Sequence, residues 1–433
     1  MLTITLPQAI TLAVLIGVVI ALIADRGRPE VIALSGAAVL LLSGAIRPMQ
    51  VQSAFASPAI IALASLFVIS YSMERSGLLD QAVRAGVWLG RKAGRLGIWI
   101  VIMASGGASA FLNNSPIVIL AAPVVRDVAQ AIHQPPKRYL IPLSYITVLG
   151  GCVTLIGTST NLLVNDMARA AGHPGFGLFD IAPVGLAIAL GGAIYLLLFS
   201  NRLAHDVDQN DGPSLPGLAA TANVGRPELF EAPRPFSPWR ALVSFGVFVA
   251  AVALAAIGFA PIAATAFAGA VFLIAFKVIE PGEAYAGLRP DVLLLIAGMV
   301  VIGLALEQTG LADQATRGLA GVVTRLDPFW ALVIFYGTTL LLTEILSNAT
   351  VAVLITPVAM SLAETIGVSP TPFIVATMMA GSAAFATPFG YQTNAIVYRM
   401  GEYRYMDFVR FGLPLNILTW AIGSAVIPIW FPF

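Results

Sequence analysis

The long stretches of this chain without a charged side chain are the feature that most constrains its fold. Residues 241–276 are 36 consecutive positions without Asp, Glu, Lys or Arg. Charged residues make up only 10% of the sequence, against about 25% in ordinary soluble domains, and 58% of the residues are hydrophobic. A helix needs about 20 apolar residues to cross a bilayer. The pattern predicts an all-α polytopic membrane protein and excludes both a soluble enzyme and a disordered chain.

Apolar runs between charged residues mark the expected membrane crossings. The run at 241–276 is long enough for two helices, and Gly258 and Pro261 near its middle favour a tight turn there. With that run counted twice, the sequence predicts ten crossings. The expected runs are 7–24, 31–46, 54–73, 139–165, 181–201, 241–276, 292–306, 365–398 and 411–433.

Two further apolar stretches, 96–131 and 328–363, are expected to be re-entrant hairpins rather than crossings. In the first, the 30 apolar residues 96–125 folded in two give helical arms of about 22 Å, short of the roughly 30 Å hydrocarbon core. Its fold point is the Asn-Asn-Ser-Pro run at 113–116, which interrupts a helix. The second stretch is interrupted by Ser-Asn-Ala-Thr at 347–350, although its length alone fits either a hairpin or a crossing.

Lysine and arginine residues set the expected orientation. With ten crossings, two hairpins and the N-terminus outside, only Arg47, Arg169, Arg317 and Arg325 of the 23 basic residues fall outside. This excess of positive charge on the inner side follows the positive-inside rule. The polar stretch 202–239 is then expected to be a cytoplasmic linker between two halves of the chain.

A repeat relates the two halves. Residues 72–86 and 305–319 are identical at seven of 15 aligned positions, at an offset of 233. Nearly the same offset aligns the two hairpin tips, so the second hairpin is assigned by analogy with the first. Each half, 1–201 and 240–433, then has five crossings and one hairpin, and an odd number of crossings inverts the second half. Inverted repeats with broken helices are typical of secondary transporters, and a duplicated bundle without a transport role is the alternative.

Four polar interruptions at membrane depth carry the candidate chemistry. They are the two hairpin tips and two runs inside predicted crossings, 154–161 and 387–394. Irregular backbone is tolerated in a membrane only where it is buried in protein or lines a cavity. Free N–H groups at helix N-termini attract anions, whereas carbonyl, Asn and Ser/Thr oxygens suit a hard cation such as sodium. For any one of these residues the alternative is a hydrogen bond to a neighbouring helix.

Glu344 is the only acidic residue in the stretch 328–363. A carboxylate inside a membrane is a functional candidate by default, here for coupling transport to a cation. The alternative is that Glu344 accepts hydrogen bonds from the free N–H groups of its own hairpin and fixes the tip.

Three sequence runs carry a resemblance to a known family. They are Leu-Thr-Glu-x-x-Ser-Asn-x-Thr at 342–350, Ile-Gly-Thr-Ser-Thr-Asn-Leu at 156–162 and Ala-Thr-Pro-Phe-Gly-Tyr-Gln-Thr-Asn at 386–394. Together they resemble the divalent anion:sodium symporter family of the ion transporter superfamily, in particular its sulfate-permease-like bacterial branch. The family implies an inverted-repeat homodimer that works by an elevator motion. Of its Ser-Asn-Thr tip signature, Asn114 and Asn348 are retained, and Ala349 stands where Thr is expected.

The resemblance also implies which residues bind the ions and the substrate. The first sodium site would comprise Ser109, Asn113, Asn114 and backbone near Cys152, and the second Thr343, Ser347, Asn348 and backbone near Ala386. The substrate would contact Asn114, Ser115, Thr154, Asn348, Thr350 and Thr387. Ser109 and Thr343 each lie four residues before a tip residue, one helical turn back on the same face.

The expected function is sodium-coupled symport of a small divalent anion, sulfate first and a C4-dicarboxylate second, by a multi-pass protein of the bacterial inner membrane. A proton-coupled or efflux permease of the same superfamily, for arsenite or for sodium/proton exchange, is the alternative. A channel does not require two broken repeats. An intramembrane enzyme would need a nucleophile–base pair or metal ligands, which the sequence does not offer at membrane depth. The net charge of +1 gives no reason to expect a nucleic-acid partner.

Overall fold

The computed structural model describes residues 5–23, 27–78, 81, 94–201, 236–311, 327–388 and 390–433. Within these ranges every regular element is a helix, and many helices have proline in their first turn. Proline is well tolerated there, because the backbone N–H it lacks has no helical partner at that position. Most of the predicted linker, the repeat residues 82–86 and 312–319, and the predicted external residues Arg317 and Arg325 lie outside the described ranges.

The helices of the first half follow the predicted apolar runs. They are α1 (Leu6–Ile23), α2 (Pro29–Leu42), α3 (Pro48–Phe55), α4 (Pro58–Arg75), α6 (Arg95–Ser109), α7 (Asn114–Ala131), α8 (Lys137–Gly151), α9 (Ser159–Ala170) and α10 (Ala182–Phe199). α6 and α7 flank the first tip. α8 and α9 occupy the predicted crossing 139–165, with irregular backbone at 152–158 between them.

The second half repeats this order of helices. They are α11 (Pro238–Ala256), α12 (Ile262–Ala275), α13 (Pro281–Gly287), α14 (Pro290–Gln308), α16 (Pro328–Thr343), α17 (Asn348–Ile366), α18 (Thr371–Ser382), α19 (Gln392–Met400) and α20 (Tyr405–Trp430). The expected turn between α11 and α12 contains Gly258 at φ +74°. α11 begins inside the predicted linker, because Pro238 starts the helix. That the halves have opposite orientations in the membrane stays a prediction.

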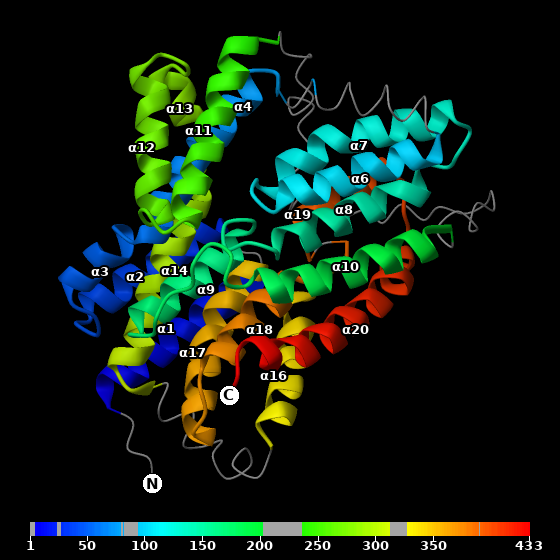
Figure 1. Ribbon diagram of the computed structural model, residues 1–433. Helices are drawn as coiled ribbons and strands as arrows, with labels where there is room; N and C mark the ends of the chain where they lie inside the picture. Colours follow the sequence, from blue (N-terminus) through cyan, green and yellow to red (C-terminus); the bar gives the residue numbers. More distant parts are fainter. Residues whose placement is uncertain are drawn as a thin grey trace.

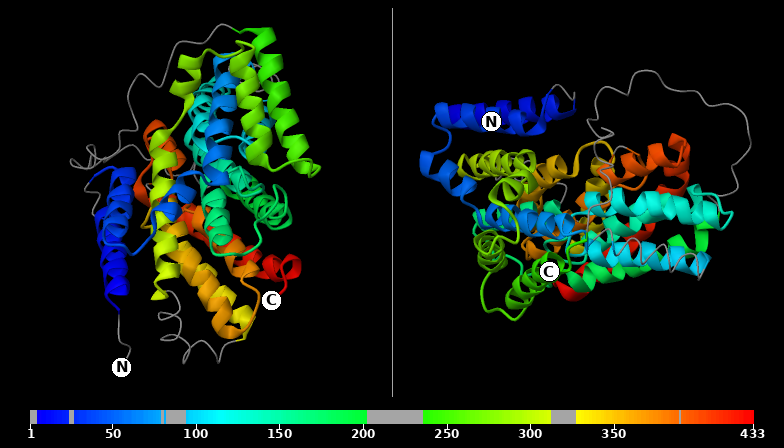
Figure 2. Two further views of the ribbon diagram at one scale, coloured as in Figure 1. Left: turned by 90° about the vertical axis from the view of Figure 1, so that its left-hand side faces the viewer. Right: turned by 90° about the horizontal axis from the view of Figure 1, so that it is seen from above.

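The helices pack into two groups (Figure 1). The α14 group consists of α1–α4 and α11–α14, and the hairpin group consists of α6–α10 and α16–α20. Both groups draw on both halves of the chain, since α2 packs on α14, α4 on α12, and α10 on α20. The groups meet where α14 contacts α9 and α17, and where α4 contacts α9. Figure 2 shows α1 and α2 side by side at one edge of the molecule.

Helix length gives a separate measure of which segments can cross a bilayer. Among the residues that the structure describes, five stretches are long and apolar enough, and the pair α13–α14, bent by 56°, would be a sixth. The five are Pro48–Arg75, Ala182–Phe199, Pro238–Ala256, Asn348–Ile366 and Tyr405–Trp430. α6 and α16, with 15 and 16 residues, reach only about 22–24 Å, as expected for re-entrant arms. α17 has 19 residues and could cross, so ten crossings with two hairpins stay a prediction.

Candidate functional site

The first tip brings Ser109 and Asn114 together inside the hairpin group. α6 ends at Ser109 and α7 begins at Asn114, which is 1% exposed. The Ser109 hydroxyl donates a hydrogen bond to Asn114 Oδ1. Asn113 instead caps α7, because its Oδ1 accepts from the backbone N–H of Ser115 at 3.5 Å. Of the two asparagines, only Asn114 therefore presents its amide oxygen to a hydroxyl group.

The second tip has the same arrangement. The Thr343 hydroxyl at the end of α16 lies 3.0 Å from Asn348 Oδ1 at the start of α17, and 2.9 Å from the carbonyl oxygen of Gly381. Ser347 caps α17, because its Oγ accepts from the Thr350 N–H at 3.2 Å. The Ser347 and Thr350 hydroxyl groups lie 2.7 Å apart. The hydroxyl-to-amide pair of the first tip therefore recurs, and so does the helix cap.

Each half has one break, the non-helical backbone between α8 and α9 or between α18 and α19. A threonine in each break is hydrogen-bonded to the hairpin of the same half. Thr154 donates a hydrogen bond to the carbonyl oxygen of Ala110, just after α6. Thr387 donates to the carbonyl oxygen of Glu344, just after α16, at 3.2 Å. In both breaks an asparagine seven residues later donates from Nδ2 to the threonine's carbonyl oxygen at 3.1 Å. Each half therefore builds one hairpin tip and one break into a single hydrogen-bonded unit.

Two side chains that the sequence analysis did not assign connect the first tip to the second break. Asn114 Nδ2 donates to the Tyr391 hydroxyl at 2.7 Å, and the Ser115 hydroxyl donates to Gln392 Oε1 at 3.0 Å. The Tyr391 hydroxyl also lies near the side chain of Thr158, the N-cap residue of α9. The N-termini of α7, α9 and α19 therefore adjoin. Tyr391 and Gln392 lie within the polar run 387–394, which is the signal that could have found them.

Glu344 contacts the second break and α20. Its Oε1 atom accepts hydrogen bonds from the backbone N–H groups of Phe385 and Ala386, both at 2.8 Å. It also accepts from Asn416 Nδ2 at 2.6 Å. These donors differ from the predicted alternative, in which the N–H groups of the hairpin itself bind Glu344. Asn416 was not identified from the sequence, because it is one of a few polar residues in a largely apolar stretch and lies 72 positions further along the chain.

The two backbone positions assigned to the sodium sites lie in the breaks and have other contacts. The carbonyl oxygen of Cys152 faces α10, since a Cβ atom at Gly185 would lie 2.3 Å from it. The Ala386 N–H donates to Glu344. In the part of the chain that the structure describes, no three His, Cys, Asp or Glu side chains gather to hold a metal ion. The oxygens that fit a hard cation such as sodium are the amide and hydroxyl oxygens of the two tips.

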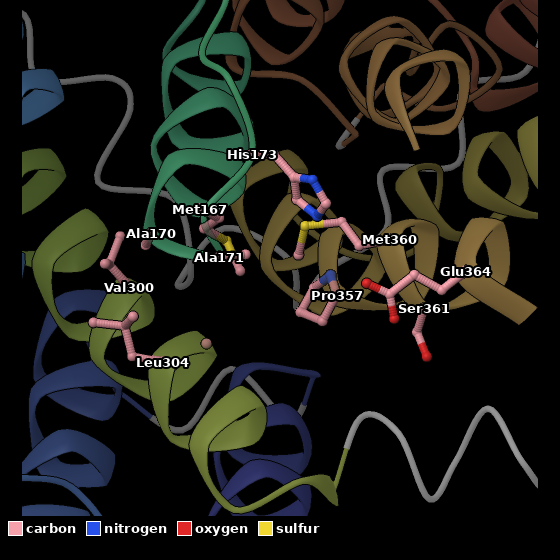
Figure 3. A pocket seen from close by; sticks show the side chains of 11 residues that line it. Met167, Ala170, Ala171, His173, Val300, Leu304, Pro357, Met360, Ser361 and Glu364 are labelled. Atoms are coloured by element: carbon pink, nitrogen blue, oxygen red, sulfur yellow. The ribbon is translucent and has the colours of Figure 1, made fainter. Parts of the chain in front are cut away.

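A cavity of about 230 Å³ lies away from the tips, between the α14 group and the hairpin group (Figure 3). Residues of α9, α14 and α17 line it, with Met167, Pro357 and Met360 giving an apolar surface. The titratable side chains that line the cavity are those of His173 and Glu364. The cavity contains none of the predicted site residues, so it marks the interface between the two helix groups.

Residues 19–380 match the family described as "Citrate transporter". The chain belongs to the citrate transporter family. This confirms the relationship to the ion transporter superfamily that the three sequence runs predict. Citrate transporter family members and the similar proteins below are transporters, not enzymes.

Similar proteins span nearly the whole chain of this citrate transporter family member. It is 24% identical to the uncharacterized transporter sll0640 of Synechocystis, over 94% of this chain and 95% of that protein. It is 23% identical to the sodium-dependent dicarboxylate transporter SdcS of Staphylococcus saprophyticus, over 86% of this chain and 76% of that protein. A shorter match, 45% identical, covers 21% of this chain and 11% of the probable sodium/sulfate cotransporter 3 of Chlamydomonas reinhardtii.

A solved structure shares the fold. The YdaH transporter of Alcanivorax borkumensis superposes with a TM-score of 0.61 at 17% identity, covering 88% of this chain and 87% of that one. The match and the apolar helices agree with the predicted all-helical, polytopic membrane fold. This citrate transporter family member is therefore a polytopic membrane transporter.

Proposed function

We propose that the protein is a sodium-coupled symporter of a small divalent anion, sulfate first and a C4-dicarboxylate second, in the bacterial inner membrane. The observation that carries the proposal is the paired arrangement of Asn114 and Asn348. Each is the first residue of the helix after a tip, and each amide oxygen lies beside a hydroxyl group at the end of the preceding helix. The named relatives include sodium-dependent dicarboxylate and sodium/sulfate transporters.

The anion is proposed to bind where helices begin. The adjoining N-termini of α7, α9 and α19 offer partial positive charge, about half an elementary charge each. Amide and hydroxyl side chains at these ends can donate to an oxyanion. The proposed contacts are Asn114, Ser115, Thr154, Asn348, Thr350 and Thr387.

Sodium is proposed to supply the remaining positive charge. No Lys, Arg or His occurs in the two tips or the two breaks. A divalent anion without a full counter-charge is very costly at membrane depth. The proposed ligands are Ser109, Asn113, Asn114 and backbone near Cys152 for one ion, and Thr343, Ser347, Asn348 and backbone near Ala386 for the other. Two sodium ions would neutralise one divalent anion.

The movement is proposed to be an elevator displacement of the hairpin group against the α14 group, in a homodimer. The candidate site belongs to the hairpin group alone, because both tips and both breaks are built from α6–α9 and α16–α19. The cavity beside α14 lies on the interface along which the groups would slide. Inverted repeats and alternating access go together in secondary transporters.

Uptake into proteoliposomes tests the proposal. Labelled sulfate, succinate, citrate and arsenite are offered under an inward sodium gradient, an inward proton gradient without sodium, and neither gradient. We expect sulfate or succinate to accumulate only with sodium. Thr338→Ala, which changes an exposed hydroxyl on α16, is the control variant and should transport normally. Accumulation driven by the proton gradient alone would favour the proton-coupled permease, and arsenite movement would favour the efflux permease.

A further inference from the structure

The second break reaches the first tip through two neighbouring side chains. The Tyr391 hydroxyl accepts a hydrogen bond from Asn114 Nδ2 at 2.7 Å, and Gln392 Oε1 accepts one from the Ser115 hydroxyl at 3.0 Å. Asn114 and Ser115 are the residues of the first tip that the proposed function assigns to the anion. Tyr391 and Gln392 therefore border the proposed anion site, although neither is among its proposed contacts.

The first half has short side chains at the same two positions. The offset of 233 aligns Tyr391 with Thr158 and Gln392 with Ser159, and the glycine before them and the threonine and asparagine after them are identical in the two breaks. The backbone is the same as well, with φ −138° and ψ 143° at Thr158 and φ −139° and ψ 143° at Tyr391. The break therefore forms without long side chains, which only the second half has.

Tyr391 is a poor residue for the helix start that it occupies, since threonine is favoured at an N-cap and tyrosine is not. Thr158 Oγ1 accepts from the backbone N–H of Thr160 at 3.4 Å and so caps α9. Tyr391 gives α19 no side-chain cap, and its hydroxyl bonds to Asn114 instead. A residue that weakens the start of its own helix and contacts another element indicates a role in the site rather than in the helix.

The Tyr391 hydroxyl lies where three helices begin. It bonds to Asn114, the first residue of α7, it lies near Thr158, which precedes α9, and Tyr391 itself precedes α19. The proposed function places the anion at these three N-termini, because their N–H groups attract negative charge. The phenol ring fills part of that space. It leaves more room for a compact anion than for one whose two charges lie at the ends of a four-carbon chain.

Gln392 adds hydrogen-bond donors beside the first tip. Its Oε1 atom accepts the single hydroxyl hydrogen of Ser115. Nε2 is bonded to the same carbon atom as Oε1, so its two N–H groups also lie close to Ser115. The residue is exposed, and Nε2 forms no hydrogen bond within the part of the chain that the structure describes. Gln392 therefore offers two free donors in place of the one that Ser115 gives up.

We propose that Tyr391 and Gln392 make the site selective for a compact oxyanion of the sulfate type over a C4-dicarboxylate. The inference rests on the proposed function, whose substrate class it narrows. Gln392 contacts the anion through Nε2, and Tyr391 limits the length of the anion that fits. A tetrahedral oxyanion carries all its acceptor oxygens around one atom, so it can meet these closely spaced donors at once. A dicarboxylate also needs space for its carbon chain, and the phenol takes up that space.

Calorimetry on purified protein, with sulfate and succinate in sodium and in choline buffer, tests the proposal. The double variant Tyr391→Thr plus Gln392→Ser gives the second break the residues of the first. We expect its Kd for sulfate to rise roughly 10- to 150-fold, which corresponds to one lost hydrogen bond to a charged group. Its Kd for succinate should not rise. A folded double variant with the wild-type ratio of the two Kd values would overturn the proposal, and so would wild-type protein that prefers succinate.

Gln392→Glu separates a contact with the anion from a merely structural role. The glutamate keeps the length of the side chain and an acceptor for the Ser115 hydroxyl, but it has no N–H group. The position is exposed, so the variant should fold even where the double variant does not. We expect sulfate affinity to fall at least about tenfold. Wild-type sulfate affinity in this variant would show that Gln392 only joins the second break to the first tip.

Tyr391→Phe is the matched control for the ring. It loses the hydroxyl group and keeps the bulk, so succinate should bind no more tightly than to the wild type. A gain in succinate affinity equal to that of the double variant would show that the ring does not limit the length of the anion.

The same measurements separate this inference from the proposed function. Sodium-dependent binding of both anions with an unchanged ratio in the double variant would overturn the inference alone. Equal binding in sodium and choline would overturn the sodium coupling, while the ratio would still report on Tyr391 and Gln392. Wild-type protein that binds neither anion would overturn both.

Discussion

Thr343→Val removes one hydroxyl group from the second tip and leaves the side chain nearly the same shape. Thr343 is fully buried at the end of α16. Its hydroxyl lies within hydrogen-bond distance of Asn348 Oδ1 and of the carbonyl oxygen of Gly381. The variant therefore leaves buried acceptors without a donor, which typically costs about 1–3 kcal/mol.

The same change should weaken sodium binding. If Thr343 Oγ1 is a sodium ligand, a loss of about 1–3 kcal/mol corresponds to a roughly 5- to 150-fold higher sodium concentration for half-maximal uptake. Thr343→Ser keeps the hydroxyl group and should retain most of the wild-type sodium affinity. Thr338→Val changes a hydroxyl on the exposed side of the same helix, bonded to the Ile334 carbonyl, and should leave uptake unchanged.

The assay is initial uptake into proteoliposomes at a series of sodium concentrations, with the amount of folded protein measured by size-exclusion chromatography. A folded Thr343→Val variant with the wild-type sodium dependence would refute the assignment of Thr343 to a sodium site. A variant that loses uptake equally at all sodium concentrations would instead place the defect in the substrate site or in the movement.

Three further outcomes are expected. Asn114→Ala and Asn348→Ala should each abolish uptake while folded protein remains in the membrane, because each leaves buried partners unpaired; normal uptake by either would exclude the symmetric site. Gly157→Ala should lower the melting temperature, since its Cβ would lie 2.4 and 2.9 Å from two backbone carbonyl oxygens, an overlap that costs about 1–3 kcal/mol; an unchanged melting temperature would argue against this packing. A cysteine at position 210, in a Cys152-free background, should resist an impermeant reagent added outside intact cells, and labelling there would contradict the predicted orientation.

The sequence determined the features that depend on local chain properties. Long apolar runs form helices because a chain in lipid must satisfy its own backbone hydrogen bonds. The tips and breaks fall at or near the polar runs with Asn, Gly and Pro: α7 begins at the first tip, and the irregular backbone between α8 and α9, at 152–158, overlaps the predicted run 154–161. Spacing placed Ser109 and Thr343 four residues before Asn113 and Ser347, but their hydroxyl groups pair with Asn114 and Asn348, one residue further along the chain.

The tertiary structure alone decided which distant groups meet. Asn114 and Tyr391 are 277 residues apart in sequence and 2.7 Å apart in space. Asn416 lies on the last helix, and nothing near it in the sequence indicates a carboxylate partner. Asn113 and Ser347 carry the residue types of ligands, yet their side chains cap helices. The residue type determines which hydrogen bonds a side chain can make. Which partner the side chain meets depends on how helices from both halves pack, and local periodicity does not encode that packing.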